Sequence, residues 1–315
     1  MRILVNNIRS TNSTLLVRML KRIKRFPVEV WGSDVSKAGY IASSTFVDRY
    51  FQSPSIDNES EYLAFLKRLS DNYQIDLIFV STDKEVRFMD KYNYQIKIPF
   101  FNPPSETIKL FQNKFDASLA IEKLGVCIPS IYSNLFGKEK VIFRKKQSVS
   151  SEGIYVVDLS KATYIENHFC NDWFAQEYIT GTTYVIDVFA DKDGNPKLIL
   201  PRQSIETLNG SAFRSKIVKN KELIDICKYI YSNFCIPGLS NIEFIENGGK
   251  YYFIEINLRI GGSATAGIIA SFNYIEQYLD HFVNNNSLEN LETYMNCVAW
   301  NSIISRYYEE VIVYK

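Results

Sequence analysis

The stretch YYFIEINLRIGGSATAG, residues 251–267, places an acid, an amide and a guanidinium at every second position of an apolar segment. Since successive side chains of a β-strand point to opposite faces, Glu255, Asn257 and Arg259 are expected to share one face. A glycine-rich turn folds the preceding strand back alongside, which brings Glu243 within reach. Carboxylate and amide oxygens are ligands that Mg²⁺ prefers, with Mn²⁺ able to replace it, and the guanidinium suits a phosphate. The alternative is an ordinary hairpin whose polar side chains face water.

A second candidate stretch is KVIFRKKQSVSSEGIYVV. A strand delivers Arg144 and Lys146 to one face and then enters a serine- and glycine-containing loop that includes Ser150, Ser151 and Gly153. Small residues allow backbone N–H groups to close on phosphates, and the basic side chains balance their charge. Neither GxxxxGK[ST] nor GxGxxG is present, so this is not one of the common phosphate-binding loops. The alternative is a surface hairpin with a basic edge.

The third stretch, WFAQEYITG, is a strand that leads to Gln176 and Glu177, then to Ile179 and a turn at Gly181. An adenine ring needs a flat apolar slot with backbone donors and acceptors at its edge, and a hinge between domains provides both. A plain strand end is the alternative interpretation.

The N-terminal part must position these groups through a different kind of sheet. Residues 1–100 alternate short apolar strands with helical patterns, which predicts a doubly wound parallel sheet. Ligands of such sheets collect at the carboxyl ends of the strands. The polar residues expected there are Asn6, Asn7, Arg9, Ser10, Ser81, Thr82, Asp83 and Glu85. The breaker FFNPPSET ends this part, with Ser105 as the expected N-cap of one helix over 107–124.

From Lys140 onward the pattern changes to strands and turns. Hairpins are predicted at the DKDG sequence and at residues 247–249, a helix over 222–234, and a last strand in AWNSIISRYY. We therefore predict α/β followed by α+β structure in three parts. These are an N-terminal domain (1–102), a linking helix with a small lid subdomain (103–174) and a C-terminal mixed-sheet domain (175–315).

Composition narrows the function classes. The net charge is +1 in 315 residues, which argues against a general nucleic-acid binder. No run of about 20 apolar residues exists, so no membrane partner is expected. Five scattered cysteines without a CxxC pair favour a reducing cytoplasm. The two histidines lack partners at ligand spacing, which removes zinc chemistry and a Ser-His-Asp triad.

Taken in order, these stretches resemble the ATP-grasp superfamily, in particular its carbamoyl-phosphate-synthase-like and carboxylate–amine ligase branch. EINLRIGGS resembles the family's E-x-N-x-R motif followed by small residues, with Leu258 where proline is usual. NIEF resembles the strand that carries the other metal ligand, RKKQSVSSEGI the phosphate loop, and QEYITG the adenine hinge. NKFD resembles an earlier basic position, which would be Lys114.

The resemblance implies a role for each matching residue. Glu243, Glu255 and Asn257 would hold Mg²⁺, and the catalytic cations would be Arg259 and Arg144. The implied ATP-binding residues are Lys114, Arg144, Lys146, Ser150, Ser151, Gly153, Gln176, Glu177, Ile179 and Thr183. Thr183 stands where relatives often carry a ribose-binding glutamate, so ribose contacts at that position are in doubt.

The expected activity is an ATP-dependent ligase that activates a small carboxylate as an acyl phosphate for attack by an amine, with ADP and phosphate released. One alternative stops at an acyl or carbamoyl phosphate, and another is a non-catalytic ATP-binding sensor. Arg202 and Arg214 are candidates to pair with a substrate carboxylate, and Arg9 and Asp83 to contact the second substrate. A homo-oligomer is compatible with the sequence.

Overall fold

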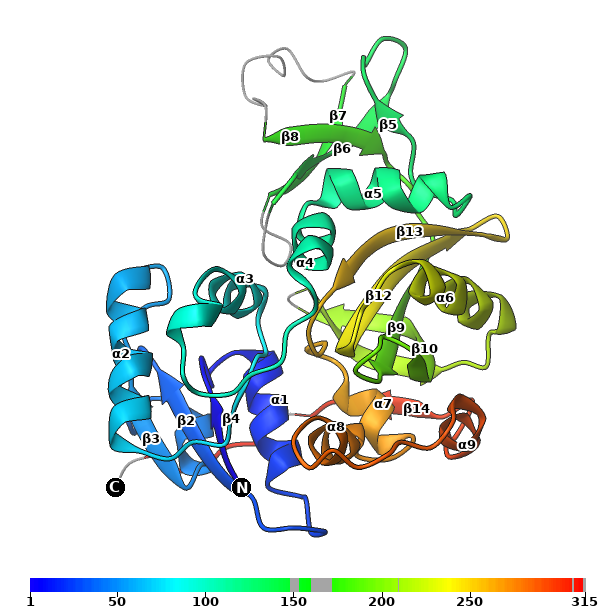
Figure 1. Ribbon diagram of the computed structural model, residues 1–315. Helices are drawn as coiled ribbons and strands as arrows, with labels where there is room; N and C mark the ends of the chain where they lie inside the picture. Colours follow the sequence, from blue (N-terminus) through cyan, green and yellow to red (C-terminus); the bar gives the residue numbers. More distant parts are fainter. Residues whose placement is uncertain (148–152, 160–171, 209, 308, 314–315) are drawn as a thin grey trace.

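The computed structural model describes residues 1–147, 153–159, 172–208, 210–307 and 309–313. They form three sheets with helices packed between and around them (Figure 1). The fold class is confirmed: a parallel N-terminal sheet is followed by an antiparallel middle sheet and a C-terminal sheet. The division at residues 102 and 174 stays a prediction.

The N-terminal sheet is parallel, with the strand order β3-β2-β1-β4. Its strands are β1 (Arg2–Val5), β2 (Glu29–Asp34), β3 (Arg49–Gln52) and β4 (Leu77–Phe79). Along β1, Ile3 and Val5 enter one core and Leu4 enters another, so both faces are covered. Helix α1 (Thr11–Leu20) packs on the first face. Helices α2 (Glu59–Asn72) and α3 (Asp83–Lys91) pack on the second, which is the doubly wound arrangement. Short 3₁₀ turns lie at Ala42–Thr45 and Asn93–Gln95.

The helix predicted over 107–124 is instead two helices, α4 (Ser105–Gln112) and α5 (Lys114–Lys123). Asn113 separates them, because its side chain caps α5 by accepting hydrogen bonds from the backbone of Phe115 and Asp116 at 3.1 and 3.3 Å. The expected N-cap of α4 was also one residue late, since Pro104 occupies that position and Ser105 is already helical.

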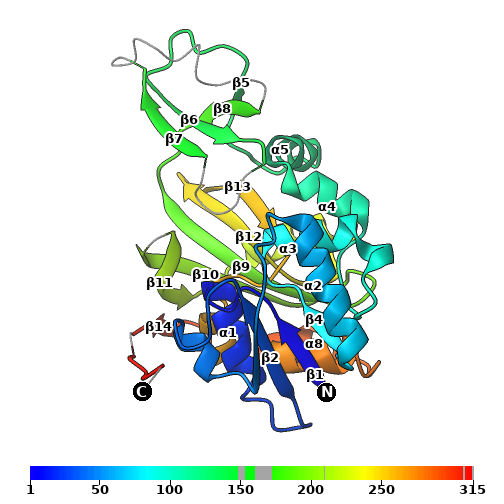
Figure 2. The same ribbon diagram turned by 90° about the vertical axis from the view of Figure 1, so that its left-hand side faces the viewer.

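The middle sheet, here called the lid sheet, is antiparallel with the order β5-β8-β6-β7. Its strands are β5 (Ile131–Tyr132), β6 (Lys140–Lys145), β7 (Ile154–Asp158) and β8 (Trp173–Glu177). It lies at one end of the molecule, beyond α5 and far from the N-terminal sheet (Figure 2). Among the described residues its buried core consists of Val141, Phe143 and Ala175.

The C-terminal sheet has the order β13-β12-β9-β10-β11-β14. Its strands are β9 (Thr182–Ala190), β10 (Pro196–Leu208), β11 (Ser211–Ile217), β12 (Gly238–Asn247), β13 (Lys250–Asn257) and β14 (Ile303–Ser305). We expected a mixed sheet, but all of its described pairs are antiparallel. The reason is that β12 returns beside β9 after helix α6 (Lys221–Asn233) and runs opposite to it. Both predicted hairpins and the closing strand β14 are present.

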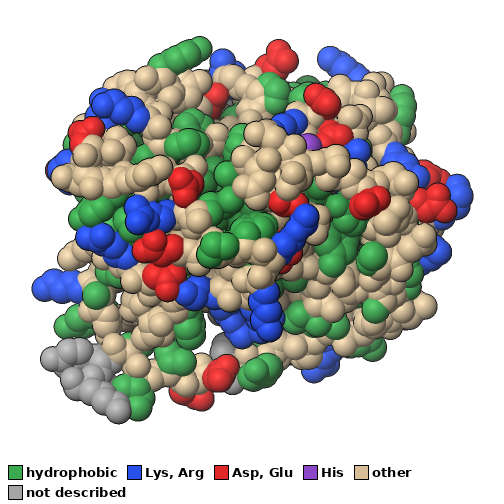
Figure 3. Space-filling view, turned by 60° about the horizontal axis from the view of Figure 1, so that its bottom comes forward, with side chains coloured by type: hydrophobic (Ala, Val, Ile, Leu, Met, Phe, Trp, Pro, Cys, Tyr) green, Lys and Arg blue, Asp and Glu red, His purple; other side chains and the backbone are tan. Residues whose placement is uncertain are grey.

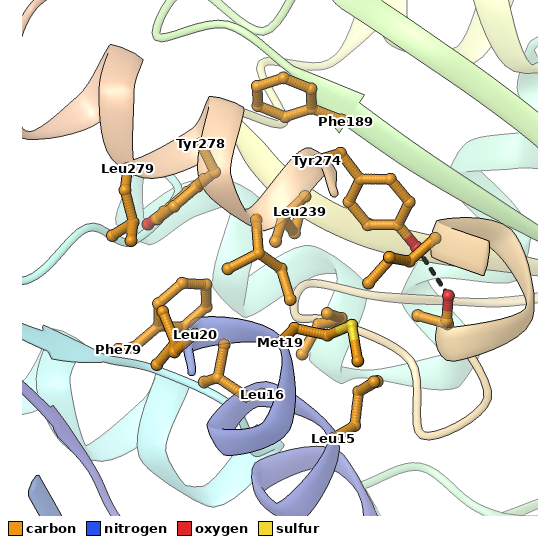
Figure 4. Close-up of a cluster of buried hydrophobic side chains, with 14 of the residues drawn as sticks. Leu15, Leu16, Met19, Leu20, Phe79, Phe189, Leu239, Tyr274, Tyr278 and Leu279 are labelled. Carbon is orange, nitrogen blue, oxygen red and sulfur yellow. Dashed lines mark hydrogen bonds between the residues drawn. The ribbon is translucent and has the colours of Figure 1, made fainter. Parts of the chain in front are cut away.

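One hydrophobic core joins the N-terminal sheet to the C-terminal sheet. The remaining helices are α7 (Thr265–Ile269), α8 (Tyr274–Phe282) and α9 (Leu291–Asn296). Figure 4 shows Leu16 and Met19 of α1 facing Tyr278 and Leu279 of α8, and Leu239 of β12 belongs to the same cluster. This shared packing holds the carboxyl ends of the parallel strands against the end of β13.

On the face seen in Figure 3, acidic and basic side chains are interspersed with apolar ones. Among the helices of the described residues, none combines the length and the apolar character that crossing a membrane requires.

Candidate active site

The site is built on the hairpin of β12 and β13. Their register places Glu243 opposite Glu255 and Asn241 opposite Asn257. This pairing depends on a β-bulge, because Phe244 pairs with residue 253 while Glu243 pairs with residue 255. If the regular pairing continued from the turn without a bulge, Glu255 would lie opposite Ile242, the neighbour of Glu243. The bulge therefore creates the carboxylate pair.

The bulge also explains how an apolar strand can carry the acid. Phe253 and Ile256 are both buried in the core although they lie three positions apart, which an unbroken alternation does not allow. Ile254 is the extra residue, and its carbonyl oxygen accepts a hydrogen bond of 3.1 Å from the guanidinium of Arg144. A buried cation from the lid sheet thus satisfies the carbonyl that the bulge turns away from the ladder.

Glu255 is surrounded by donors. It forms ion pairs with Lys114, the first residue of α5, and with Arg144 at 3.2 Å. The amide of Asn257 donates to its other oxygen at 3.1 Å. Burial alone would raise the pKa of Glu255, but the two cations outweigh burial and hold the pKa well below its usual value. Glu255 is therefore ionised at neutral pH.

Glu243 has the opposite character. Burial first, and then the neighbouring charge of Glu255, raises the pKa of its carboxyl group. Within the described part of the chain its carboxylate makes no direct hydrogen bond, so its oxygens are available as ligands. Like charges directly opposite on two strands are unfavourable, and a bound cation between them would relieve the repulsion.

These donors fit Mg²⁺ when other oxygens complete its shell. The described residues contain no cluster of three or more Asp, Glu, His or Cys side chains that could hold a metal on its own. Two carboxylates and the Asn257 amide oxygen leave several positions of an octahedral ion for waters or phosphate oxygens, as is usual for Mg²⁺. The chemistry of the set thus suits an ion that arrives with a nucleotide.

Arg259 connects this hairpin to the N-terminal sheet. Its guanidinium binds Asp83 at 3.0 and 3.2 Å and the oxygen of Asn257 at 3.2 Å. Asp83 is the first residue of α3, whose start is fixed by a capping box of Thr82 and Glu85. The polar loop after β4 and the end of β13 therefore meet at one guanidinium.

From the lid sheet, Arg144 reaches down to the hairpin. It is 3% exposed and also donates to Gln176 at 3.2 Å. Lys146, two residues further on, instead lies over the ring of Phe115 at 5.2 Å. The backbone of Lys114 donates to the carbonyl of Lys146 at 2.8 Å, which ties α5 to the end of β6. Three of the predicted ATP-binding cations thus lie around one corner of the lid sheet.

The remaining predicted nucleotide residues are placed less uniformly. Gly153 has a φ of +75° and its carbonyl accepts from Lys145 at 2.9 Å. Ser150 and Ser151 lie outside the described residues. The buried Gln176 side chain is oriented toward Arg144 and the Pro129 carbonyl, 3.4 Å away.

The hinge follows at the end of β8. Glu177 accepts from the backbone and hydroxyl of Ser130 at 3.3 and 3.0 Å, and its own backbone pairs in the sheet. Ile179 and Thr183 lie beyond it, and Thr183 is paired with a residue of β12. At Gly181 a Cβ atom would collide with the backbone oxygen of Glu246, so only glycine allows the hinge to run this close to the hairpin.

Arg202 does not have the role that we expected. Its fully buried guanidinium makes two bonds to Asp187, at 2.7 and 2.8 Å, and one to Ser263 at 3.1 Å. The carboxylate partner of this arginine is therefore part of the core. Arg214 lies on the surface beside Glu206 at 3.4 Å.

Residues 111–263 match a family model described as an ATP-grasp domain. This segment, just under half of the chain, belongs to the ATP-grasp superfamily. The match spans Lys114, Arg144, Glu243, Glu255 and Arg259, and it makes the protein an ATP-dependent enzyme of the ATP-grasp type. No match appears among curated protein sequences.

Solved structures share this ATP-grasp fold at low identity. Biotin carboxylase from Campylobacter jejuni, in complex with an ATP compound, has a TM-score of 0.68 at 17% identity, over 92% of this chain and 72% of that one. N5-carboxyaminoimidazole synthetase from Staphylococcus aureus has a TM-score of 0.69 at 14%, over 92% and 78%. L-amino acid ligase from Bacillus licheniformis has a TM-score of 0.66 at 15%, over 90% and 74%.

The sequence reasoning missed two members of this candidate site. Asn241 accepts from Asn257 at 3.1 Å and donates to the Arg259 carbonyl at 3.2 Å, so it orients both. Asn12 of α1 donates to the Ile260 carbonyl at 3.1 Å, and a Cβ atom on Gly262 would lie only 2.5 Å from its oxygen. The pairing of Asn241 with Asn257 could have been found from the hairpin register, whereas the approach of Asn12 is a long-range contact.

Proposed function

We propose that this protein is an ATP-dependent, ADP-forming ligase that activates a small carboxylic acid as an acyl phosphate, which an amine then attacks. One observation carries the proposal. The carboxylates of Glu243 and Glu255 face each other across a bulged hairpin, and cations from three separate elements approach the same point. Such a concentration of opposite charge suits a polyphosphate and its metal ion.

In this proposal Glu243, Glu255 and Asn257 hold Mg²⁺, which supplies charge compensation to the phosphates when it is bound. Lys114 and Arg144 contact the phosphates from α5 and β6, with Lys146 at the rim. Glu255 already pairs with Lys114 and Arg144. Its carboxylate therefore orients the two cations that would contact the phosphates. The hinge at 177–181 would contact the adenine.

The chemistry needs no nucleophile from the protein. A substrate carboxylate oxygen attacks the terminal phosphorus of ATP, the bond to the bridging oxygen breaks, and ADP leaves with the electron pair. The amine then attacks the acyl carbon, and phosphate departs as the amine loses a proton. Arg259 lies between the hairpin and the polar loop after β4, where it can hold the transferred phosphoryl group. Positioning and charge neutralisation account for most of such a rate enhancement.

The test is to trap the acyl phosphate. With ATP, Mg²⁺ and a panel of small carboxylic acids, hydroxylamine should yield a hydroxamate for the acids that are substrates, because it replaces the natural amine. ADP release should rise when the natural amine is added.

The matched control is Glu255→Gln, which keeps the shape of the side chain and should give no hydroxamate. Tight ATP binding by calorimetry, with neither hydroxamate nor acid-stimulated ADP release from any acid, would reject the ligase and favour a nucleotide sensor. Phosphorylation of bicarbonate alone would favour the carbamoyl-phosphate-forming alternative.

A further inference from the structure

Two cavities lie side by side near Arg259, and their charges differ. The first, about 460 Å³, is lined by Arg259, Asp83 and residues at the carboxyl ends of the parallel strands. Its three cations each pair with an acid: Asp83 with Arg259, Asp57 with Lys84 at 2.6 Å, and Arg9 with Asp34 at 3.7 Å. A fourth acid in the lining, Glu85, accepts hydrogen bonds from Ser81 and Thr82 instead. This cavity includes Arg259, which the proposed function places at the transferred phosphoryl group, and it has no excess of cations that would select an anion.

The second cavity, about 400 Å³, lies between α1, the small-residue loop after Arg259, and strands β11 and β14. Figure 2 shows α1 beside these two strands. Its charged lining residues are Arg9, Arg18, Arg22 and Arg306, with no acid among the residues that line it. The rest of the wall is apolar or carries hydroxyl groups, including Met19 and Phe213. Such a wall fits an apolar stem that ends in an anion.

The two cavities are adjacent and share part of their lining. Arg9 and Thr11 line both of them. Gly262, in the wall of the second, is three residues after Arg259, and three residues span at most about 11 Å. A molecule with its reacting carboxylate at Arg259 can therefore extend past Arg9 into the arginine-lined cavity.

Arg18 and Arg22 have no ion-pair partner, within the described part of the chain, that would account for their position beside this cavity. Both side chains are exposed. They lie four residues apart, Arg18 in the last turn of α1 and Arg22 just after its C-cap, where like charges repel slightly. Interaction with the helix dipole favours a cation there but does not require two beside a cavity.

We propose that the acid substrate of this enzyme carries a second anionic group, a carboxylate or a phosphate, which binds Arg18 and Arg22. The inference rests on the proposed ligase function and adds the class of its substrate. Guanidinium groups bind carboxylate and phosphate alike through paired hydrogen bonds, so both chemistries share the site.

The experiment compares linear dicarboxylates from malonate to suberate with monocarboxylates of equal length and with the corresponding phosphonocarboxylates. Hydroxamate formation is measured for the wild type, for Arg18→Gln/Arg22→Gln, and for Lys21→Gln, a neighbouring cation at the C-cap of α1 that does not line the cavity, as the control. The wild type and the control should prefer dianionic acids, and the better of the two dianionic series identifies the second group. The double variant should raise the KM for these acids roughly 10- to 100-fold while the KM for ATP stays unchanged.

A preference that survives in the double variant, or no preference at any length in the wild type, overturns the substrate class. If no acid of any series is turned over, the proposed function has failed instead, and the cavity is then judged by calorimetry with the same dicarboxylates and phosphonocarboxylates. Binding at least tenfold tighter to the wild type than to the double variant would support the anion site without the ligase. Equal or absent binding would refute the site as well.

Discussion

The lid sheet and the C-terminal sheet carry opposite charges of the candidate site, and their hydrophobic cores differ greatly in size. The lid sheet carries Arg144 over a core that, among the described residues, is Val141, Phe143 and Ala175. The C-terminal sheet carries Glu243 and Glu255, and its two faces belong to the large cores that also bury α1, α6 and α8. Glu243 and Glu255 therefore belong to the sheet with the larger core, and the buried Arg144 belongs to the sheet with the smaller core.

The difference shows how a nucleotide site can be rigid and adaptable together. The carboxylate pair is fixed by strand register, which cannot change without moving a whole core face. Arg144 is fixed mainly by its bonds to the Ile254 carbonyl, Glu255 and Gln176. Phosphates that replace these partners could shift the lid sheet while the hairpin stays in place.

The largest effect is expected where the two regions meet. Glu255→Gln removes the charge that pairs with Lys114 and Arg144 and that would hold the metal ion. We expect ATP turnover to fall by roughly 10³-fold or more, because charge compensation is the main source of catalysis here. Steady-state ADP release measures this loss, and circular dichroism checks that the fold is retained.

Glu246→Gln, on the partner strand but at the hairpin turn, is the control and should keep turnover. Turnover at the wild-type rate in Glu255→Gln would show that the hairpin is structural only.

The next effect concerns stability and tests the C-terminal sheet alone. Asp187→Ala leaves the fully buried Arg202 without its carboxylate. We expect the free energy of unfolding to fall by about 3–5 kcal/mol, the usual cost of leaving a buried charge unpaired. Urea denaturation measures it.

Glu206→Ala breaks a pair of the same type, with Arg214, in which both side chains are nearly half exposed. It should cost no more than about 1 kcal/mol. Equal losses in the two variants would contradict the assignment of Arg202 to the core.

The chemistry of the site could be predicted from the sequence because it depends on local alternation. Glu255, Asn257 and Arg259 on one strand and Glu243 on its hairpin partner follow from period two and a glycine turn. The exact opposition of the two acids could not be predicted, because it requires the bulge at Ile254. That bulge is stabilised by Arg144, which lies about a hundred residues away in the chain.

Other misses had visible signals. Asn113 followed three residues later by Asp116 is a cap signature, and it divides what looked like one helix. The partner of Arg202 also follows from hairpin register, since Asp187 pairs with Leu200, two positions before the arginine on the same face. By contrast, the antiparallel pairing of β12 with β9 depends on a crossover, which no local pattern encodes.

The third effect tests whether the lid sheet contributes binding rather than stability. Arg144→Ala removes a charged donor that the proposal places on the phosphates. We expect kcat/KM for ATP to fall roughly 10- to 100-fold, the equivalent of one charged hydrogen bond of about 1.5–3 kcal/mol. Glu255 keeps its ion pair with Lys114, so the loss of unfolding free energy should be smaller than in Asp187→Ala.

Lys145→Ala, an exposed neighbour on the opposite face of β6, is the matched control. Unchanged ATP affinity in Arg144→Ala would refute its role.

The smallest effect distinguishes Arg144 from Lys146. The alternation of side chains along β6, continued by one residue, places both cations on one face. Lys146 is partly exposed and lies over Phe115, whereas Arg144 is buried against the hairpin. A screened cation at the rim contributes about 0.5–1 kcal/mol, so Lys146→Ala should weaken binding of Mg²⁺ and ADP only about two- to fivefold. Calorimetry at low and high salt measures this, and the difference from wild type should shrink as salt rises. Lys146→Ala could instead weaken nucleotide binding as much as Arg144→Ala does, without any dependence on salt. Burial against the C-terminal sheet would then not determine which cation of the lid sheet contributes more to binding.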